Sequence, residues 1–182
     1  MSQVVWHVMT SLDGFIAGPD DTMAWAFEYE GPNRLADEEM RSTGAILAGR
    51  RWYDVATERY NGRQGIYGGR WEGPVFVLTH RADDHDVSDP GITLLTGELE
   101  DAVSTARDAA GDKNVEIFGA NVAAQCLDHG LIDEIVVHVA PVLLGVGVRL
   151  YGEAGSRAQV RLEPVERVES GDLQSLRFRV IR

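Results

Sequence analysis

Residues 115–151 constrain the fold more than any other part of the chain. The stretch begins with a short apolar run, residues 115–118, and breaks at Gly119. Small and apolar residues then recur at the spacing of one helix face until Gly130, where a helix-ending glycine is expected. A second apolar run, residues 135–144, follows. A strand, a helix and a strand in this order predict a βαβ unit, and such units build parallel sheets.

Two further apolar runs end in residues suited to an anion. Gly49-Arg50-Arg51 follows the short run 45–48, and Thr79-His80-Arg81 follows the run 75–78. A glycine between a strand and a helix lets the backbone approach a ligand, although many αβ proteins place one there only to turn the chain. Two guanidinium groups at a helix start oppose the helix dipole, and forked binding of phosphate is a reason for their presence. If the three strands are adjacent, their ends form one groove for an extended phosphorylated ligand.

Composition and charge limit the partners. The chain has 182 residues, of which 44% are hydrophobic and 25% charged, and these values predict one globular domain over residues 1–182. A net charge of −12 disfavours nucleic acid and anionic membranes as partners. No run approaches the roughly 18 apolar residues of a membrane span. The first residues, MSQVVWHVM, lack a secretory signal, so a cytoplasmic location is expected.

Neither a disulfide nor a metal site is expected. Cys126 is the only cysteine and has the surroundings of a small core residue rather than of a catalytic thiol. The tract HRADDHD at residues 80–86 holds potential metal ligands, but they lack regular spacing and lie in a polar turn.

A first strand is expected near residues 4–8, followed by the loop SLDGFIAGPDD at residues 11–21. Leu12, Phe15 and Ile16 are apolar although they lie in this loop. They either form a lid over a ligand at the carboxyl end of the sheet or pack the loop onto the core, and both interpretations remain open. Asp13, at the mouth of the loop, is the candidate for a catalytic role as a polar substrate contact or proton relay.

The following segments are less specific. The aromatic residues of 25–29 either line a pocket for a flat ring or pack on the surface. A helix is expected from residues 32–33 to Gly44, with the acidic residues 37–39 on a solvated face, one of which could donate a proton. Five glycines in residues 61–73 predict a mobile connection. A helix should end at Gly111, and alternation around a turn at 170–172 predicts a final antiparallel hairpin at the sheet edge.

Four segments together resemble a known family. SLDGFIAGPDD, GRRWYD, PVFVLTHR and GLIDEIVVHVAPVLLGVGVRLY, in this order and spacing, are similar to the dihydrofolate-reductase-like superfamily. The most similar member is the reductase (C-terminal) domain of the bifunctional riboflavin-biosynthesis deaminase/reductase, here standing alone. The resemblance covers residues 3 to about 152, and the hairpin by pattern only. It implies a three-layer αβα fold with a mixed, mostly parallel sheet of about eight strands, which binds NADPH across the strand ends.

The resemblance also implies roles for individual residues. The cofactor phosphates would be held by Gly49, Arg50 and Arg51, and the adenosine ribose with its 2′-phosphate by Thr79, His80 and Arg81. The pyrophosphate would lie on Phe118, Gly119, Ala120, Asn121 and Val122, and the nicotinamide near Met9, Ile16 and Ala17. Candidate substrate contacts are Trp25, Phe27 and Met40.

Two functional hypotheses follow. The first is an NADPH-dependent reductase that acts on a small pterin, a pyrimidine resembling 5-amino-6-ribosylaminouracil phosphate, or a carbonyl compound. The second is a catalytically silent nucleotide- or ligand-binding module on the same fold. Ala120, where the family usually has a second glycine, and Trp52, where it often has a small hydroxyl residue, favour the second. The helix from Asn33 lacks an unambiguous match to the buried acid of dihydrofolate reductase, which favours a pterin- or pyrimidine-type reductase over that enzyme.

Assembly is the last expectation. Residues 139–145 are apolar throughout, and the closing strand adds Leu176, Phe178 and Val180. Long apolar edge strands rarely stay exposed, so either the terminal hairpin or a second copy should cover them. Because the reductase domains that the chain resembles commonly form two-fold dimers, we expect a homodimer with an isologous contact around residues 136–144 and 173–181.

Overall fold

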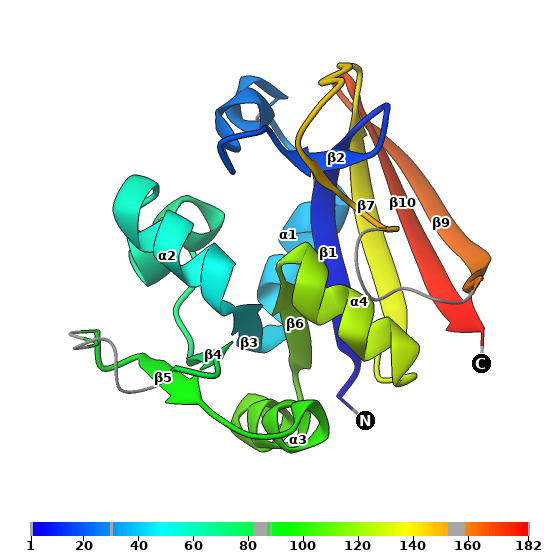
Figure 1. Ribbon diagram of the computed structural model, residues 1–182. Helices are drawn as coiled ribbons and strands as arrows, with labels where there is room; N and C mark the ends of the chain where they lie inside the picture. Colours follow the sequence, from blue (N-terminus) through cyan, green and yellow to red (C-terminus); the bar gives the residue numbers. More distant parts are fainter. Residues whose placement is uncertain (1, 30, 82–86, 88, 153–158, 182) are drawn as a thin grey trace.

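The computed structural model describes residues 2–29, 31–81, 87, 89–152 and 159–181 (Figure 1). An eight-stranded sheet in the order β5-β4-β3-β6-β1-β7-β10-β9 forms the centre, and β2 and β8 form a small second sheet. The strands of the large sheet are β1 (Val4–Ser11), β3 (Thr43–Gly49), β4 (Val75–Leu78), β5 (Ile92–Leu95), β6 (Asn114–Phe118), β7 (Glu134–Ala140), β9 (Arg161–Ser170) and β10 (Leu173–Ile181). Those of the small sheet are β2 (Phe15–Ala17) and β8 (Val148–Arg149).

Helices cover both faces of the large sheet. The α-helices are α1 (Arg34–Ser42), α2 (Arg50–Arg59), α3 (Leu99–Ala110) and α4 (Ala120–Asp128), and the 3₁₀ segments are η1 (Ala24–Tyr29) and η2 (Gly62–Gly69). In Figure 1, α4 crosses in front of the sheet and α1 lies behind it. The fold is therefore the three-layer αβα arrangement that the resemblance implies.

Strand direction agrees with the expected mixed sheet. The six strands from β5 to β7 pair in parallel, whereas β10 and β9 pair antiparallel and close the sheet as a hairpin. The predicted βαβ unit is β6-α4-β7, and β1 lies between its two strands. All six parallel strands therefore end at one edge of the sheet, called here the carboxyl edge.

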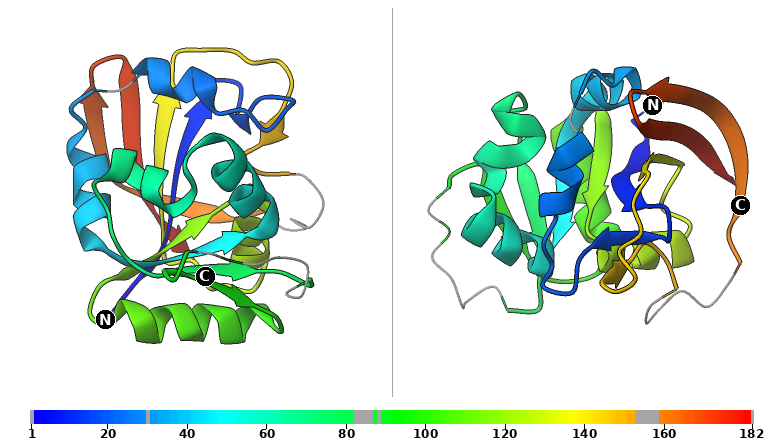
Figure 2. Two further views of the ribbon diagram at one scale, coloured as in Figure 1. Left: turned by 90° about the vertical axis from the view of Figure 1, so that its left-hand side faces the viewer. Right: turned by 90° about the horizontal axis from the view of Figure 1, so that it is seen from above.

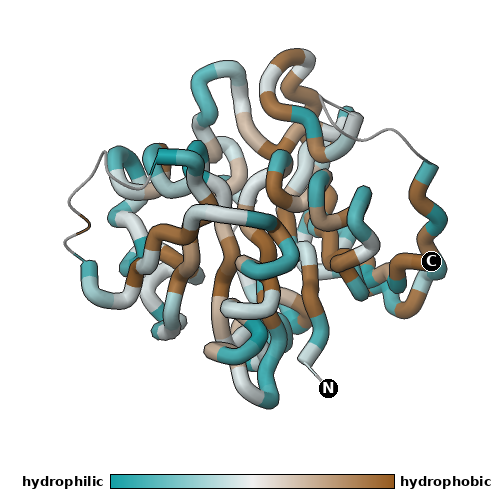
Figure 3. Tube along the Cα trace, turned by 60° about the horizontal axis from the view of Figure 1, so that its bottom comes forward, coloured by the Kyte–Doolittle hydropathy of each residue, from teal (hydrophilic) through white to brown (hydrophobic). Residues whose placement is uncertain are grey.

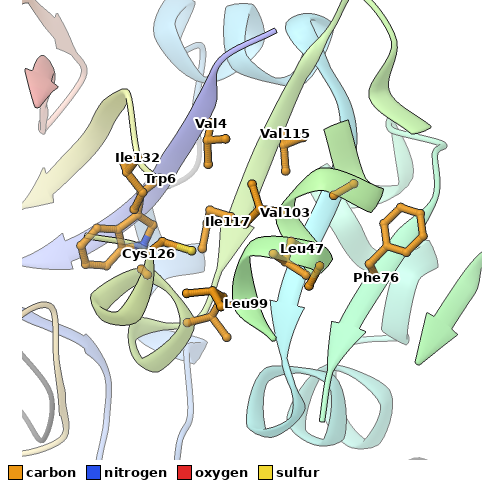
Figure 4. Close-up of a cluster of buried hydrophobic side chains, with 14 of the residues drawn as sticks. Val4, Trp6, Leu47, Phe76, Leu99, Val103, Val115, Ile117, Cys126 and Ile132 are labelled. Atoms are coloured by element: carbon orange, nitrogen blue, oxygen red, sulfur yellow. The ribbon is translucent and has the colours of Figure 1, made fainter. Parts of the chain in front are cut away.

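The face under α3 and α4 is dry and apolar. Alternate residues of β1, β3 and β6 point into it, among them Trp6, Leu47 and Ile117, and they pack against Val103 and Cys126 of the two helices (Figure 4). Burial raises the pKa of the Cys126 thiol to about 12, as expected of a core residue. Along the chain trace, hydrophobic residues concentrate in the central strands and polar residues at the periphery (Figure 3).

The opposite face is shared by three elements. Leu35 of α1 packs against Val5 and Val136, while η2 packs over β3 and β4 through Ile66. Figure 2 shows α1 and α2 on this side, and in its right-hand view β9 and β10 bend away from the other strands.

Two expectations about this face are wrong. Residues 61–73 are not simply a mobile connection, because most of them form η2, and the indole N–H of the buried Trp71 donates to the Thr43 carbonyl at 3.1 Å. The acidic residues of α1 are not all on a solvated face, since Glu39 is only 2% exposed. Its carboxylate accepts a hydrogen bond from Arg177 of β10 at 2.6 Å, and this partner allows the burial.

The expected strand over residues 135–144 is too long, and its position at an edge is wrong. β7 ends at Ala140, because Pro141 has no N–H to continue a ladder. It is paired on one side with β1 and on the other with β10, so the outer strand is β9. The backbone of β7 and β10 therefore has no free edge for a second copy.

Among the described residues, no helix is long and apolar enough to cross a membrane.

Gly44 lies inside β3 and does not end α1 as expected. The position requires a glycine because the end of α3 leaves no room for a side chain. A Cβ at this position would lie 2.6 Å from the Ala110 carbonyl oxygen and 2.7 Å from Lys113 Cβ. We expect Gly44→Ala to lower the free energy of unfolding by about 1–3 kcal/mol through overpacking. Urea denaturation measures this. Gly31→Ala is the control, since a Cβ there meets nothing within 4 Å, and an equal loss in both variants would contradict the packing explanation.

Candidate functional site

The strand order brings the three predicted anion sites together at the carboxyl edge. β4, β3 and β6 are neighbours, so the residues that follow them, Thr79, Gly49 and Gly119, stand side by side. The condition for one continuous site is therefore met. β1 and β7 extend the same row, and in open αβ sheets ligands bind at this edge.

Two helix N-termini meet at this row. Gly49 precedes α2 and Gly119 precedes α4, and neither helix start has a side-chain cap. The glycines permit a close approach, since a Cβ on Gly49 would lie 3.0 Å from Val122 Cγ2 and one on Gly119 would lie 3.9 Å from the Gly49 nitrogen. Gly119 also has φ of +95°, which disfavours any side chain. The first-turn N–H groups of both helices can therefore point at one anion.

The arginines at this edge do not all point the same way. Arg50 Nη1 donates to the carbonyl oxygen of Arg81 at 3.4 Å, which places these two residues beside each other. Arg50 is also held by Asp54 on its own helix at 2.7 Å. Arg51, by contrast, is 69% exposed and pairs with Asp21 at 2.6 Å, so in this conformation it ties the loop after β2 to α2.

Thr79 and its neighbours border the same place. The Thr79 hydroxyl accepts a hydrogen bond from the Arg81 N–H at 3.1 Å, and the Thr79 N–H donates to the carbonyl of Leu95. Thr79 is buried, whereas His80 and Arg81 are exposed. A ligand at this end of the row would therefore meet two basic side chains over a fixed turn.

Phe118 ends β6, and Trp52 packs against it. Their rings lie 5.1 Å apart in an edge-on arrangement. The large side chain at position 52 is thus part of the apolar packing under α2. Ala120 and Asn121 form the first turn of α4, where Asn121 is exposed.

The loop after β1 contains regular secondary structure. Its residues 15–17 form β2, which pairs with β8, and Gly147 fits against this pair so closely that a Cβ would lie 2.1 Å from the Ala17 carbonyl oxygen. Phe15 is buried while Leu12 is 67% exposed, so the loop both packs onto the core and presents an apolar side chain outward. Met9 and Ile16 are half-buried.

Asp13 holds the loops after β1 and β7 together. Its carboxylate accepts hydrogen bonds from the Ser11 hydroxyl at 2.6 Å and from the N–H groups of Leu144 and Gly145 at 3.1 and 2.8 Å. The Ser11 hydroxyl, followed by these N–H groups, lowers the pKa of Asp13 to about 2. The carboxylate is therefore ionised at neutral pH, which suits an acceptor better than a proton donor.

The aromatic candidates lie on η1, before α1. Trp25 Nε1 is buried, and no described residue accepts its hydrogen bond. Phe27 is 52% exposed, and its ring lies 5.6 Å from that of Tyr60. Met40 is at the other end of α1, where it packs with the cluster of Ile46 and Trp71. The structure therefore does not bring Met40 together with Trp25.

A buried polar network lies on the α1 face, and the sequence analysis missed it. His7 of β1 and His138 of β7 face each other, with Nε2 atoms 2.6 Å apart. His7 Nδ1 lies 3.0 Å from Glu116 and 2.6 Å from the Tyr67 hydroxyl, and His138 Nδ1 lies 2.7 Å from the Ser175 hydroxyl. The available signal was a polar residue at the alternate positions of otherwise apolar strands, where burial demands a partner.

Metal binding has no support in the described part of the chain, which contains no group of three or more His, Cys, Asp or Glu side chains that could hold an ion. Residues 82–86 of the tract HRADDHD lie outside the described residues.

Comparisons with known proteins agree with this geometry. A family model described as "RibD C-terminal domain" matches residues 2–173. An uncharacterized protein of Bacillus subtilis, YwjB, is 25% identical over 166 residues, which are 88% of this chain and 89% of that protein. A putative riboflavin biosynthesis protein from Shewanella sp. PV-4 superposes with a TM-score of 0.79 at 24% identity over 99% of both chains. Dihydrofolate reductase from Enterococcus faecalis, complexed with NADP(H), superposes with a TM-score of 0.66 at 12% identity over 99% of this chain and 97% of its own.

The Asp13 contacts predict a pH-dependent contribution to stability. Because the pKa of Asp13 is lowered from 3.8 to about 2, its contribution is present in full above 3.8 and is lost as the pH falls toward 2. We expect Asp13→Asn to lower the urea midpoint at neutral pH, and the difference from the wild type to narrow across that range. Asp20→Asn, in the same loop and exposed, is the control. A difference that does not depend on pH would show that the charge of Asp13 is not what holds the loops.

Proposed function

Because the chain belongs to the RibD C-terminal domain family, we propose that it is an NADPH-dependent reductase of a small heterocyclic or carbonyl substrate. The substrate class that we propose first is a pyrimidine resembling 5-amino-6-ribosylaminouracil phosphate, with pterins and carbonyl compounds as the other members of the test. The reductase-type fold of the chain and the NADP(H) bound by the dihydrofolate reductase that it resembles support the cofactor.

The observation that carries the proposal is the pair of uncapped helix N-termini at Gly49 and Gly119. A dinucleotide needs a site for its pyrophosphate and a second site for its 2′-phosphate. The first-turn N–H groups of α2 and α4 suit the former, and Arg50 beside Arg81 suits the latter. A Cβ on Gly49 would press against Val122 of α4 at 3.0 Å, so the glycine lets the two helix N-termini approach each other.

The remaining residues have simple tasks in this proposal. When bound, NADPH supplies the hydride. Met9, Ile16 and Ala17 exclude water beside the nicotinamide, while the Asp13 contacts hold the loop of Ile16 and Ala17 in place. Trp25, whose buried Nε1–H has no acceptor among the described residues, replaces Met40 as the proposed substrate contact, and η1 would have to shift to expose that N–H.

A catalytically silent nucleotide-binding module is the second candidate. The Ala120 methyl group at the start of α4 and the bulk of Trp52 against Phe118 favour it, since both occupy space near the proposed pyrophosphate. The loss of NADPH absorbance in the presence of pyrimidine, pterin and quinone substrates separates the candidates. Oxidation with any of them supports the reductase, and NADPH binding without oxidation supports the module.

Arg50 provides a test of the cofactor assignment. We expect Arg50→Ala to weaken NADPH about ten- to hundredfold, because a charge-assisted hydrogen bond contributes about 1.5–3 kcal/mol, and to leave NADH nearly unchanged. Fluorescence titration with both cofactors measures this. Arg161→Ala, an exposed arginine on the distant edge strand β9, is the control. Equal weakening of NADPH and NADH by Arg50→Ala would show that the arginine does not read the 2′-phosphate.

We also propose that the chain forms a homodimer. Because β7 and β10 have no free edge, the contact would use an apolar surface of the terminal hairpin and not the strand edges expected from the sequence. Leu162 and Val180 pair across the terminal hairpin and share one of its faces, and Leu162 is 40% exposed. Beside them, a pocket of about 270 Å³ is lined by Trp6, Leu127, Ile135, Val137, Leu150, Tyr151, Val160, Leu162 and Phe178. Light scattering at micromolar concentration should give twice the chain mass of 20.0 kDa, and a mass near 20.0 kDa would refute the dimer.

A further inference from the structure

The contact between His7 and His138 holds one proton. Their Nε2 atoms are 2.6 Å apart, a distance at which two lone pairs or two N–H groups would repel. One nitrogen therefore donates and the other accepts. The direction of this bond decides which hydrogen bonds each ring can make through its other nitrogen.

In the neutral state, one arrangement of the hydrogens satisfies every contact of the pair. Tyr67 donates its hydroxyl hydrogen to Glu116, and His7 Nδ1–H is shared between the same carboxylate at 3.0 Å and the Tyr67 oxygen at 2.6 Å. His7 Nε2 then accepts from His138 Nε2–H, which leaves His138 Nδ1 as an acceptor. That nitrogen receives hydrogen bonds from the Ser175 hydroxyl at 2.7 Å and from Asn33 Nδ2 at 3.1 Å.

A proton added to His7 reverses the direction of the hydrogen bond between the two histidines. His7 Nε2–H now donates, so His138 must accept at Nε2 and carry its own hydrogen on Nδ1. Ser175 can turn its hydroxyl and accept from that N–H. Asn33 cannot adapt in this way, because its Nδ2 hydrogens face the new N–H donor at 3.1 Å.

Asn33 is the residue that caps α1. Its Oδ1 accepts a hydrogen bond from the Ala36 N–H at 3.2 Å, while its Nδ2 faces His138 and Ser175. An amide flip would give His138 an acceptor but would turn Nδ2 toward Ala36. The Ala36 N–H of the cap and the Nδ1–H of the protonated pair's His138 therefore compete for Asn33 Oδ1.

Buried charged groups lie close to the pair. Tyr67 of η2 and Glu116 of β6 contact His7, and Glu39 of α1 interacts electrostatically with it. Behind Glu39, Arg177 of β10 pairs with both Glu39 and Glu134 of β7. Glu39, Glu116 and Glu134 are at most 6% exposed, and Arg177 is the one guanidinium among these groups. Burial and the neighbouring His7 lower the pKa of His138 to about 3, so His138 does not become doubly protonated at neutral pH.

We propose that His7 and His138 are positioning residues that form a one-proton relay, and that the state of this relay decides whether Asn33 caps α1. The neutral pair fixes the N-terminus of α1, and the protonated pair releases it. This end of α1 follows η1, which carries Trp25, so protonation also loosens the proposed substrate side of the site. Only this last effect rests on the proposed reductase function.

The relay is tested on the wild-type chain without cofactor, by ¹⁵N NMR of the histidine rings and the Ala36 amide during a pH titration. The expected result is one shared midpoint, at which His7 gains a proton, His138 changes tautomer without becoming doubly protonated, and the Ala36 amide shifts. The proposal is overturned if His138 keeps its tautomer, or if the Ala36 amide does not move, while His7 titrates.

Two variants sharpen the test. In His138→Gln the relay is cut, so His7 should still titrate while the Ala36 amide no longer follows it. His129→Gln, which changes an exposed histidine outside the network, should leave the shared midpoint unchanged. If His138→Gln does not fold, Ser175→Ala replaces it and should keep the coupling, because Asn33 and both rings remain. NADPH titration of the same samples reports on the reductase separately, so either idea can fail alone.

Discussion

β1 is paired on both sides, to β6 from Val4 to Trp6 and to β7 along nearly its whole length, from Val5 to Ser11. Since both neighbours run parallel to it, their ends and those of β3 and β4 align at one edge. The two helix N-termini, the loop of Asp13 and the loop after β7 all start from that edge. A one-residue slip of β1 would exchange Trp6 and His7 between an apolar face and a polar one, so the register is strongly determined.

The two faces of the sheet are stabilised by different physical means. Under α3 and α4 the contacts are apolar and tolerate small changes of angle. Under α1 the carboxylates of Glu39 and Glu116 are buried with directional partners, Arg177 for the first and Tyr67 with His7 for the second. Every donor and acceptor of such a network needs its partner. The packing of this face is therefore more strictly defined than that of the apolar face, and it is more sensitive to proton uptake.

The sequence predicted the parallel strands and the βαβ unit because apolar runs and glycines carry that information locally. It also indicated that Gly49, Thr79 and Gly119 would share an edge if their strands were adjacent, and the strand order of the structure meets that condition. It did not predict the burial of Glu39, because the partner, Arg177, lies 138 residues away and no local pattern points to it. For the same reason β7 was placed at an edge, and residues 61–73 were read as a connection, although Trp71 anchors them to β3. The roles of Arg50, Arg81 and Trp25 toward ligands stay predictions.

The close approach of Gly147 to the Ala17 carbonyl has a consequence for how the chain can diverge. Together with the bonds from Leu144 and Gly145 to Asp13, it joins two loops that are more than 120 residues apart in sequence into one mechanical unit. An insertion in either loop would strain the other, so their lengths should change together in related chains. New specificity would then arise more readily at η1, whose Phe27 side chain is half exposed, than in this pair of coupled loops.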